Sequence, residues 1–91
     1  MLNLAKLTDP QVVFTQITLS SHRTEDFSRF EAAARSIVEV REVHLVSGNF
    51  DYLVKFMTSG IAEYQAIIED LLEKNLAIAK YFSFIVLKSP L

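Results

Sequence analysis

The stretch that decides the fold runs from Val40 to Met57 and reads VREVHLVSGNFDYLVKFM. Its two ends, 40–47 and 50–57, are rich in β-branched and aromatic residues, which is typical of strands. Between them stands Gly48-Asn49, a pair that tolerates the positive φ angles of a tight turn. The stretch therefore predicts a β-hairpin that turns at these two residues.

The sequence before the hairpin predicts a strand followed by a helix. Residues 12–20 (VVFTQITLS) are rich in β-branched residues and follow Pro10, so they predict a strand. Thr24 is expected to cap a helix whose first turn holds Glu25 and Asp26, because carboxylates there favour the helix dipole. The apolar residues expected on the core side of this helix are Phe27, Phe30, Ala34, Ile37 and Val38.

The sequence after the hairpin repeats the pattern with a second helix and a last strand. Thr58-Ser59-Gly60 breaks the strand and offers hydroxyl groups as helix caps, and Asn75 predicts the end of the helix. Residues 78–87 (IAKYFSFIVL) predict a strand, which Pro90 prevents from continuing. The residues expected on the core side of the second helix are Ile61, Tyr64, Ile68, Leu71 and Leu72.

The order of elements, β-α-β-β-α-β, predicts an α+β fold of the ferredoxin-like type. Right-handed crossovers leave room for one strand between the two strands of each β-α-β half. The expected result is a four-stranded antiparallel sheet with both helices on one face. A chain of 91 residues suits one domain, which we expect at 11–91 after a linker-like segment at 1–10.

Both sides of two predicted strands are apolar. In the strand at 50–57 the two sides are Phe50, Tyr52, Val54 and Phe56 against Leu53 and Met57. In the last strand they are Phe82, Phe84 and Val86 against Tyr81, Ile85 and Leu87. Because helices cover only one face, we expect a second copy to cover the other with its own sheet, about 10 Å away. The sequence thus predicts a homo-oligomer, at least a dimer, that associates through the sheet.

Composition excludes several classes of function. The net charge is −2 and the basic residues are scattered, which argues against direct binding of nucleic acid. No cysteine is present, so disulfides and thiolate metal sites are excluded. No apolar stretch approaches the roughly 18–20 residues of a membrane span, and residues 1–10 do not form a secretory signal. We therefore expect a cytoplasmic protein without a membrane segment.

No pattern of catalytic or metal-binding residues stands out. His22 and His44 are the only histidines, and neither has a second ligand at metal-binding spacing. Glu69, Asp70 and Glu73 form a group that is typical of a solvated helix surface. There is no G-x-S-x-G motif and no glycine-rich phosphate loop. The sequence thus predicts no catalytic residue, no metal site and no cofactor.

The turn of the hairpin offers one arrangement with binding chemistry. Asp51 begins a strand directly after the glycine turn at 47–49. A carboxylate there could bind an ammonium group while the backbone N–H groups of the turn receive a carboxylate. These are the groups needed to hold a zwitterionic amino acid, although an ordinary hairpin turn explains the same residues equally well.

From Val13 to Leu87 the chain resembles the C-terminal effector-binding domain, or RAM domain, of Lrp/AsnC-type transcriptional regulators. The resemblance is carried by 14–20 (FTQITLS), 29–33 (RFEAA) and above all 43–54 (VHLVSGNFDYLV), and Met1-Leu2-Asn3 is similar to the linker strand before that domain. It implies the fold derived above, dimers formed through the sheets, and octamer-like assemblies. It also implies that small effectors, usually amino acids, bind in clefts between dimers.

The resemblance assigns candidate residues to the effector site. They are Leu45, Ser47, Gly48, Asn49, Asp51 and Tyr52 in the hairpin, with Ser83 as a further polar contact. Relatives commonly carry Asp where Asn49 stands, and Leu-Pro-Gly-Val where 75–78 reads NLAI. Where relatives carry a more polar, Thr-rich stretch, this chain reads KYFS at 80–83. Tyr81 and Phe82 are therefore expected to narrow or fill the cleft.

The resemblance also leaves three functions open. Regulators of the family carry an N-terminal helix-turn-helix, for which the ten residues before the first strand are too few, so we expect no helix-turn-helix and no direct DNA binding. The first function is then an amino-acid sensor that includes full-length Lrp/AsnC regulators among its partners. The second is a dimeric α+β-barrel enzyme such as a cofactor-free monooxygenase, with His44 or Tyr81 as catalytic candidates. The third is a purely structural assembly module.

Overall fold

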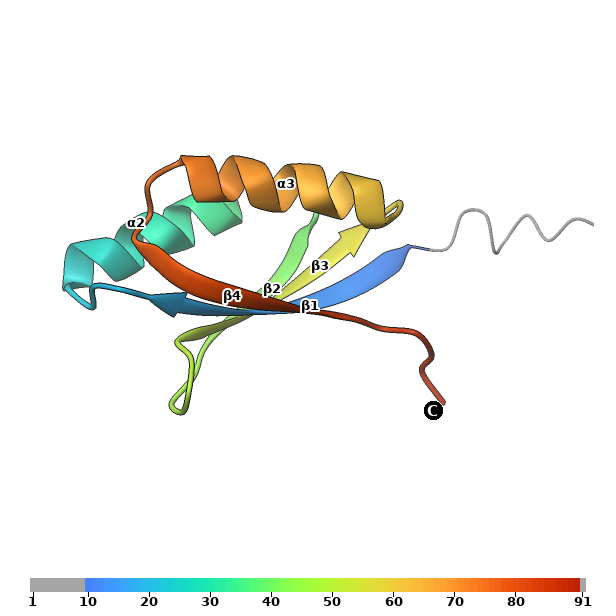
Figure 1. Ribbon diagram of the computed structural model, residues 1–91, viewed down its shortest axis with the longest axis horizontal. Helices are drawn as coiled ribbons and strands as arrows, with labels where there is room; N and C mark the ends of the chain where they lie inside the picture. Colours follow the sequence, from blue (N-terminus) through green and yellow to red (C-terminus); the bar gives the residue numbers. More distant parts are fainter. Residues whose placement is uncertain (1–9, 91) are drawn as a thin grey trace, which may run out of the picture.

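A computed structural model describes residues 10–90, and it confirms the predicted order of strands and helices. Its elements are β1 (Gln11–Leu19), α2 (Thr24–Arg35), β2 (Val40–Leu45), β3 (Tyr52–Thr58), α3 (Ile61–Glu73) and β4 (Ile78–Ile85). The linker-like segment expected at 1–10, with its Met1-Leu2-Asn3, lies outside the described residues apart from Pro10. Both helices lie on one face of the sheet, as Figure 1 shows.

The four strands form one antiparallel sheet in the order β2-β3-β1-β4. β3 lies between β2 and β1, and β1 lies between β3 and β4, which is the arrangement that two right-handed β-α-β crossovers produce. The predicted ferredoxin-like fold is therefore confirmed. β2 and β4 are the two edges of the sheet, and their separation decides below which residues can share a site.

Strict alternation in the two central strands makes the core. In β1, Val13, Thr15, Ile17 and Leu19 are at most 2% exposed, and the residues that alternate with them face the other way. In β3 the buried positions are Tyr52, Val54, Phe56 and Thr58. The helices close this side with Phe30 and Ala34 from α2 and with Tyr64, Ile68 and Leu71 from α3. Each large apolar side chain buried here contributes about 1.5–3 kcal/mol to folding.

A short chain of hydroxyl groups runs through this core. The Tyr64 hydroxyl lies 2.8 Å from Thr15 Oγ1 and 2.5 Å from Ser83 Oγ, so it links α3 to β1 and β4. Thr15 is fully buried, and Tyr64 is its hydrogen-bond partner. Because an unpaired buried hydroxyl would be costly, this chain fixes α3 above the two strands as well as satisfying the core.

The tight turn predicted at Gly48-Asn49 is wrong in length. β2 ends at Leu45 and β3 begins at Tyr52, so a six-residue loop joins them. Asp51 still bonds across the hairpin, because its carbonyl accepts the Val46 N–H at 2.9 Å, so the turn itself lies in residues 47–50. Asp51 also binds β1, since its backbone N–H donates to the Ile17 carbonyl at 2.9 Å and its carboxylate accepts the Leu19 N–H at 2.8 Å.

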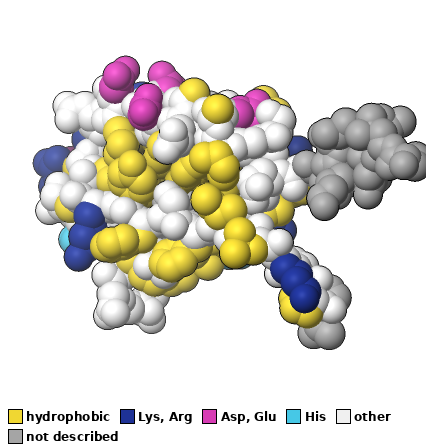
Figure 2. All heavy atoms as spheres, turned by 45° about the vertical axis from the view of Figure 1, so that its right-hand side comes forward, with side chains coloured by type: hydrophobic (Ala, Val, Ile, Leu, Met, Phe, Trp, Pro, Cys, Tyr) yellow, Lys and Arg dark blue, Asp and Glu magenta, His cyan; other side chains and the backbone are white. Residues whose placement is uncertain are grey.

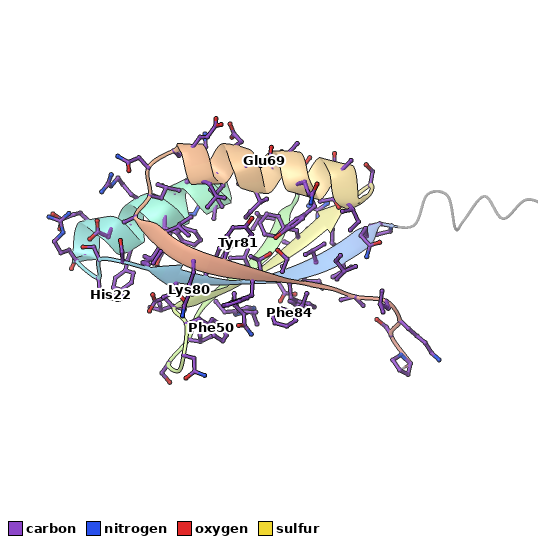
Figure 3. All side chains as sticks on the ribbon, viewed as in Figure 1. His22, Phe50, Glu69, Lys80, Tyr81 and Phe84 are labelled. Atoms are coloured by element: carbon purple, nitrogen blue, oxygen red, sulfur yellow. The ribbon has the colours of Figure 1, made fainter. Side chains whose placement is uncertain are left out.

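The side of the strand assigned to Phe50 is also corrected. Phe50 belongs to the loop and lies on the side of the sheet away from the helices (Figure 3), whereas Tyr52, Val54 and Phe56 face the helices. The loop breaks the alternation before β3 begins, and this places Phe50 on the other side. Within the loop Gly48 has φ = 151°, a value that side chains disfavour, so glycine suits this position.

The helix ends differ from the expected caps. At α2 the residue before the helix is Arg23 rather than Thr24, and the Asp26 carboxylate accepts the Arg23 backbone N–H at 3.2 Å. At α3 the residue before the helix is Gly60, so the predicted hydroxyl cap is absent, and the Glu63 carboxylate accepts the Ser59 backbone N–H at 2.6 Å just before the helix. Val38, expected in the core, is 76% exposed because α2 ends at Arg35.

The second half of the chain differs from the prediction only in detail. Asn75 has φ = 59° and ends α3 as predicted, and Ala77 adopts a similar φ of 61°. Ile61, expected in the core, is 38% exposed at the first position of α3. The last strand ends at Ile85, two residues earlier than expected.

Candidate functional site

The loop between β2 and β3 (residues 46–51) carries four of the residues that the sequence assigns to the effector site. Ser47, Gly48 and Asn49 are exposed, so their backbone groups are open to a ligand. Asp51 is half-buried and anchors the loop, because its Oδ2 atom accepts the Leu19 N–H at 2.8 Å and lies 3.0 Å from His22 Nε2. The loop is thereby tied both to the end of β1 and to the segment that leads into α2.

Asp51 has a structural role beside its predicted one as acceptor of an ammonium group. Both of its side-chain contacts in residues 10–90 use Oδ2. Oδ1 is therefore the oxygen that a ligand could use without displacing Leu19 or His22. The assignment of Asp51 to ligand binding stays a prediction that this geometry permits.

Leu45 and Tyr52 lie beside the loop rather than in it. They are cross-strand partners at the ends of β2 and β3, and both line a cavity of about 470 Å³. Leu45 is 60% exposed, whereas Tyr52 is buried and donates its hydroxyl to Glu31 Oε2 at 2.5 Å. Burial, and then the Glu31 carboxylate, raises the pKa of Tyr52 above its usual value, so the hydroxyl stays a protonated donor.

Six further residues line that cavity, and the sequence did not assign them to any site. They are Glu31, Arg35, Val40, Arg41, Glu42 and Val43. The spacing of Glu31 and Arg35, four residues apart on a helix, could have indicated that they share one side of α2. The spacing does not show which strand lies beside these residues, because that depends on the packing of α2 against β2.

Ser83 lies at the other edge of the sheet from the remaining candidates. The register pairs Ser83 with Thr15, Thr15 with Val54, and Val54 with Val43. Three strand spacings, about 14 Å, therefore separate β4 from β2. One chain does not bring Ser83 together with Leu45 and the loop, so a site that contains both would need two copies of the chain.

The two aromatic residues expected to narrow the cleft lie on opposite faces of β4. Tyr81 pairs with Ile17 and is on the helix side, where it is 37% exposed, while Phe82 pairs with Gln16 and is 54% exposed on the other side. Figure 3 shows Tyr81 above the sheet and Phe84 below it. Within one chain the two side chains therefore point to opposite faces of β4, and their predicted effect on a cleft between copies stays a prediction.

The face of the sheet away from the helices, here named the open sheet face, carries an apolar surface. Its apolar residues are Val12, Phe14, Leu53, Met57, Phe82 and Phe84, assigned by the alternation of β1 and the cross-strand register. Phe84, opposite Phe14, is 52% exposed. Figure 2 shows hydrophobic side chains gathered along the lower side of the molecule, beneath the sheet.

Charged residues border the open sheet face on the β2 side. Glu42 lies 3.1 Å from His44 Nε2 and 3.5 Å from the Lys55 ammonium group. The hydrogen bond from His44, with the charge of Lys55, lowers the pKa of Glu42 from its usual value. Lys55 also lies 6.0 Å from the centre of the Phe14 ring. The face thus passes from a charged edge at β2 to an aromatic edge at β4.

The described part of the chain contains no cluster of three His, Cys, Asp or Glu residues that could hold a metal ion. His44 and Tyr81, the candidates of the enzyme alternative, lie on opposite faces and on the two edge strands. One chain therefore does not bring them into a common catalytic site. Among residues 10–90, no helix has the length and apolarity to cross a membrane.

Comparisons with known proteins give the chain its relatives. A family model described as the Lrp/AsnC ligand binding domain matches residues 12–91. The transcriptional regulatory protein DoeX of Halomonas elongata is 41% identical over 88 residues, which cover 97% of this chain and 56% of that protein. The chain spans about half the length of the curated relatives it matches.

Solved structures show the same fold. The crystal structure of an AsnC family transcriptional regulator from Agrobacterium tumefaciens matches with a TM-score of 0.84 and 28% identity, over 99% of this chain and 58% of that one. The L-Met complex of the transcriptional regulator NMB0573 from Neisseria meningitidis matches with a TM-score of 0.82 and 19% identity, over 99% and 58% of the two chains. Because the identity is only 19%, the second match shows a shared fold and nothing more.

Proposed function

Since the chain belongs to the Lrp/AsnC ligand-binding domain family, we propose that it binds an amino acid as a homo-oligomer and regulates transcription without catalysis. The observation that carries the proposal is the loop at 46–51, which Asp51 anchors while Ser47, Gly48 and Asn49 stay exposed. A fixed loop with open backbone groups is prepared to hold the charged groups of a small ligand.

The open sheet face supports self-association. Phe82 and Phe84 are more than half exposed beside the half-buried Phe14, so a lone chain leaves an apolar surface in water. Two such faces packed about 10 Å apart would bury these residues, and the charged edge at Glu42 and Lys55 would limit the possible orientations. This makes a second copy of the chain the partner that fits the surface best.

The distance between β2 and β4 supports an effector site shared between copies. If Ser83 contributes as predicted, it does so from a different copy than the loop does, because about 14 Å separates the two edges within one chain. An assembly of dimers, of the octamer-like kind, would bring such elements together. The solved L-Met complex of a protein with the same fold supports an amino acid as the ligand class.

The oligomer is tested by sedimentation of the parent chain and of two lysine variants. Phe84→Lys places a charge on the open sheet face and is expected to yield monomers. Val38→Lys adds the same charge at a residue that is 76% exposed away from that face, and it should leave the oligomer intact. A monomeric parent at micromolar concentration, or equal behaviour of the two variants, would contradict the proposal.

Ligand binding is tested by thermal unfolding in the presence of each of the twenty amino acids. A ligand at 100 times its Kd stabilises the folded state by about 2.7 kcal/mol, which is several degrees in Tm. Asp51→Ala is expected to abolish the shift but also removes the acceptor of the Leu19 N–H. Asp51→Asn separates the two roles, because an amide oxygen can still accept that N–H but carries no charge for an ammonium group.

The outcomes of the ligand test are distinct. Loss of the shift in both Asp51 variants, with the oligomer retained, supports the loop as the site. If the ligand raises the Tm of Asp51→Asn as much as that of the parent, Asp51 does not bind the ammonium group. The absence of a shift with every amino acid at millimolar concentration would instead favour the purely structural module.

A further inference from the structure

The cavity of about 470 Å³ between α2 and β2 is a second place where one chain gathers binding groups. Its strand side includes the apolar Val40, Val43 and Leu45, which pair with buried residues of β3 and so lie on the helix side of the sheet. Glu42 of β2 also lines the cavity, and its carboxylate is already paired with His44 and Lys55. Its volume falls within the range of about 300–1,000 Å³ that is typical of small-molecule pockets. The cavity has an apolar floor, and its charged groups come from α2 and from β2 itself.

One carboxylate at the cavity is held in place. Glu31 is half-buried, and its Oε2 atom accepts the Tyr52 hydroxyl at 2.5 Å. Because burial and the neighbouring carboxylate keep Tyr52 protonated, this contact orients Glu31 without neutralising it. Glu31 therefore presents a fixed negative charge beside the apolar floor, and its other oxygen is available to a donor.

Two guanidinium groups belong to the same cavity. Arg35 follows Glu31 by one helical turn on α2, and it makes no salt bridge within residues 10–90. Arg41 comes from β2, and its Nη1 atom donates to the Val38 carbonyl at 3.2 Å, which leaves its remaining donors available. Guanidinium groups bind carboxylates in a planar, two-point geometry, so this pair favours a carboxylate ligand.

We propose that this cavity is a second binding site, contained within one chain, for a zwitterionic amino acid with an aliphatic side chain. Arg35 and Arg41 bind the carboxylate, Glu31 binds the ammonium group, and the side chain packs on Val40, Val43 and Leu45. The site shares its ligand class with the proposed function but needs neither the loop amides nor a second copy. It also touches the loop indirectly, because Tyr52 bonds Glu31 and directly follows Asp51.

The test uses the full chain, L-isoleucine as the probe, and calorimetric titration with NMR mapping of the bound region. Arg35→Met is expected to weaken binding at the cavity about tenfold or more, since it removes a charge-assisted contact of 1.5–3 kcal/mol. Glu31→Gln should weaken the binding of isoleucine to a similar extent. It should leave unchanged the affinity of the matching 2-oxo acid, which has no ammonium group. Lys74→Met, directly after the end of α3, is the control and should bind like the parent.

The outcomes separate this site from the loop site. NMR chemical-shift changes at Val43 and Tyr52 on addition of isoleucine that persist in Asp51→Asn and disappear in Arg35→Met support the cavity. This holds whether or not the loop also binds isoleucine. Perturbations confined to 46–51 overturn the cavity while the proposed function stands. Equal affinity of Glu31→Gln and parent for isoleucine, or no binding at millimolar concentration in the parent, overturns the amino-acid assignment.

Discussion

On the helix side of the sheet Val13, Ile17 and Phe56 are fully buried, whereas on the open sheet face Phe82 and Phe84 are more than half exposed. The two faces alternate along the same strands, and both are built from aliphatic and aromatic residues. What differs is the cover, because both helices lie on one side. Hydrophobic alternation therefore marks a face as apolar, and the arrangement of the other elements decides whether the chain itself covers it.

Polar residues on the two faces follow the same division. On the covered face the Tyr64 hydroxyl bonds both to the fully buried Thr15 and to the exposed Ser83. On the open sheet face Glu42 and Lys55 form an ion pair whose side chains remain 46% and 28% exposed. Water can replace the partners of Glu42 and Lys55 but does not reach the fully buried Thr15, so a lost partner should cost more at Thr15.

The largest expected effect comes from the same substitution on the two faces. Phe56→Ala removes a fully buried ring that packs edge-on against Tyr64 at 5.2 Å, and it should lower the free energy of unfolding by about 3–5 kcal/mol at every protein concentration. Phe84→Ala should cost little in dilute solution and more where chains associate. Urea denaturation at two protein concentrations measures both, and Phe56→Leu serves as a milder variant if Phe56→Ala does not fold. If Phe84→Ala lowered the free energy of unfolding equally at both concentrations, the proposed difference between the two faces would be contradicted.

A hydroxyl deletion on the covered face should have the next largest effect. Tyr64→Phe leaves the fully buried Thr15 hydroxyl without its partner and should cost about 1–3 kcal/mol. Tyr81→Phe is the matched control, because Tyr81 is on the same side but 37% exposed at the sheet edge, so its change should stay within about 0.5 kcal/mol. Chemical denaturation of the two variants measures the difference, and similar losses would show that Thr15 finds another partner.

Acid sensitivity should differ between two carboxylates. The pKa of Asp26 is lowered first by the Arg23 side chain and then by the Ser21 hydroxyl, and that of Glu42 is lowered first by His44. A folded-state pKa below the unfolded one stabilises the protein above the ordinary carboxylate range, and this stabilisation is lost as the pH falls. Asp26→Asn should therefore flatten the fall in Tm below about pH 4 more than Glu42→Gln does. Thermal melts from pH 7 to pH 2 measure this, and the reverse ranking would contradict the buried role of Asp26.

The smallest expected effect on folding comes from a charge on the open sheet face. Lys55→Met breaks an exposed ion pair with Glu42 and should change the stability of the single chain by less than about 1 kcal/mol. It also extends the apolar surface beside Phe14, so chain association should become tighter. Sedimentation at a series of concentrations measures the second effect, and weaker association would show that the charge itself makes a contact between copies.

Part of the candidate site followed from the sequence and part did not. The hairpin signature located the loop, and Leu45 and Tyr52 were assigned to the same region and do lie side by side. The sequence did not predict the six-residue length of the loop, nor the bonds that anchor it from Asp51 to Ile17 and Leu19, which lie more than thirty positions away. Local turn propensity contains no information about such contacts.

Ser83 and the cavity illustrate the same limit. The sequence assigns Ser83 to the effector site without showing which copy would contribute it, and the strand order places it across the sheet from Leu45 within one chain. The cavity could not be predicted from Glu31 and Arg35 alone, because their spacing on a helix does not show that α2 packs against β2. In both cases the missing information was the position of one element relative to another.

The sequence by itself determined the order of strands and helices, the end of α3 at Asn75, and the apolar character of both sheet faces. These features depend on periodicity and backbone preference, which act over a few neighbouring residues. Only the tertiary structure decided which apolar face is covered, how Asp51 anchors the loop, and which charges meet at the cavity. Those depend on contacts between residues far apart in the chain, and such contacts exist only once the sheet and helices have packed.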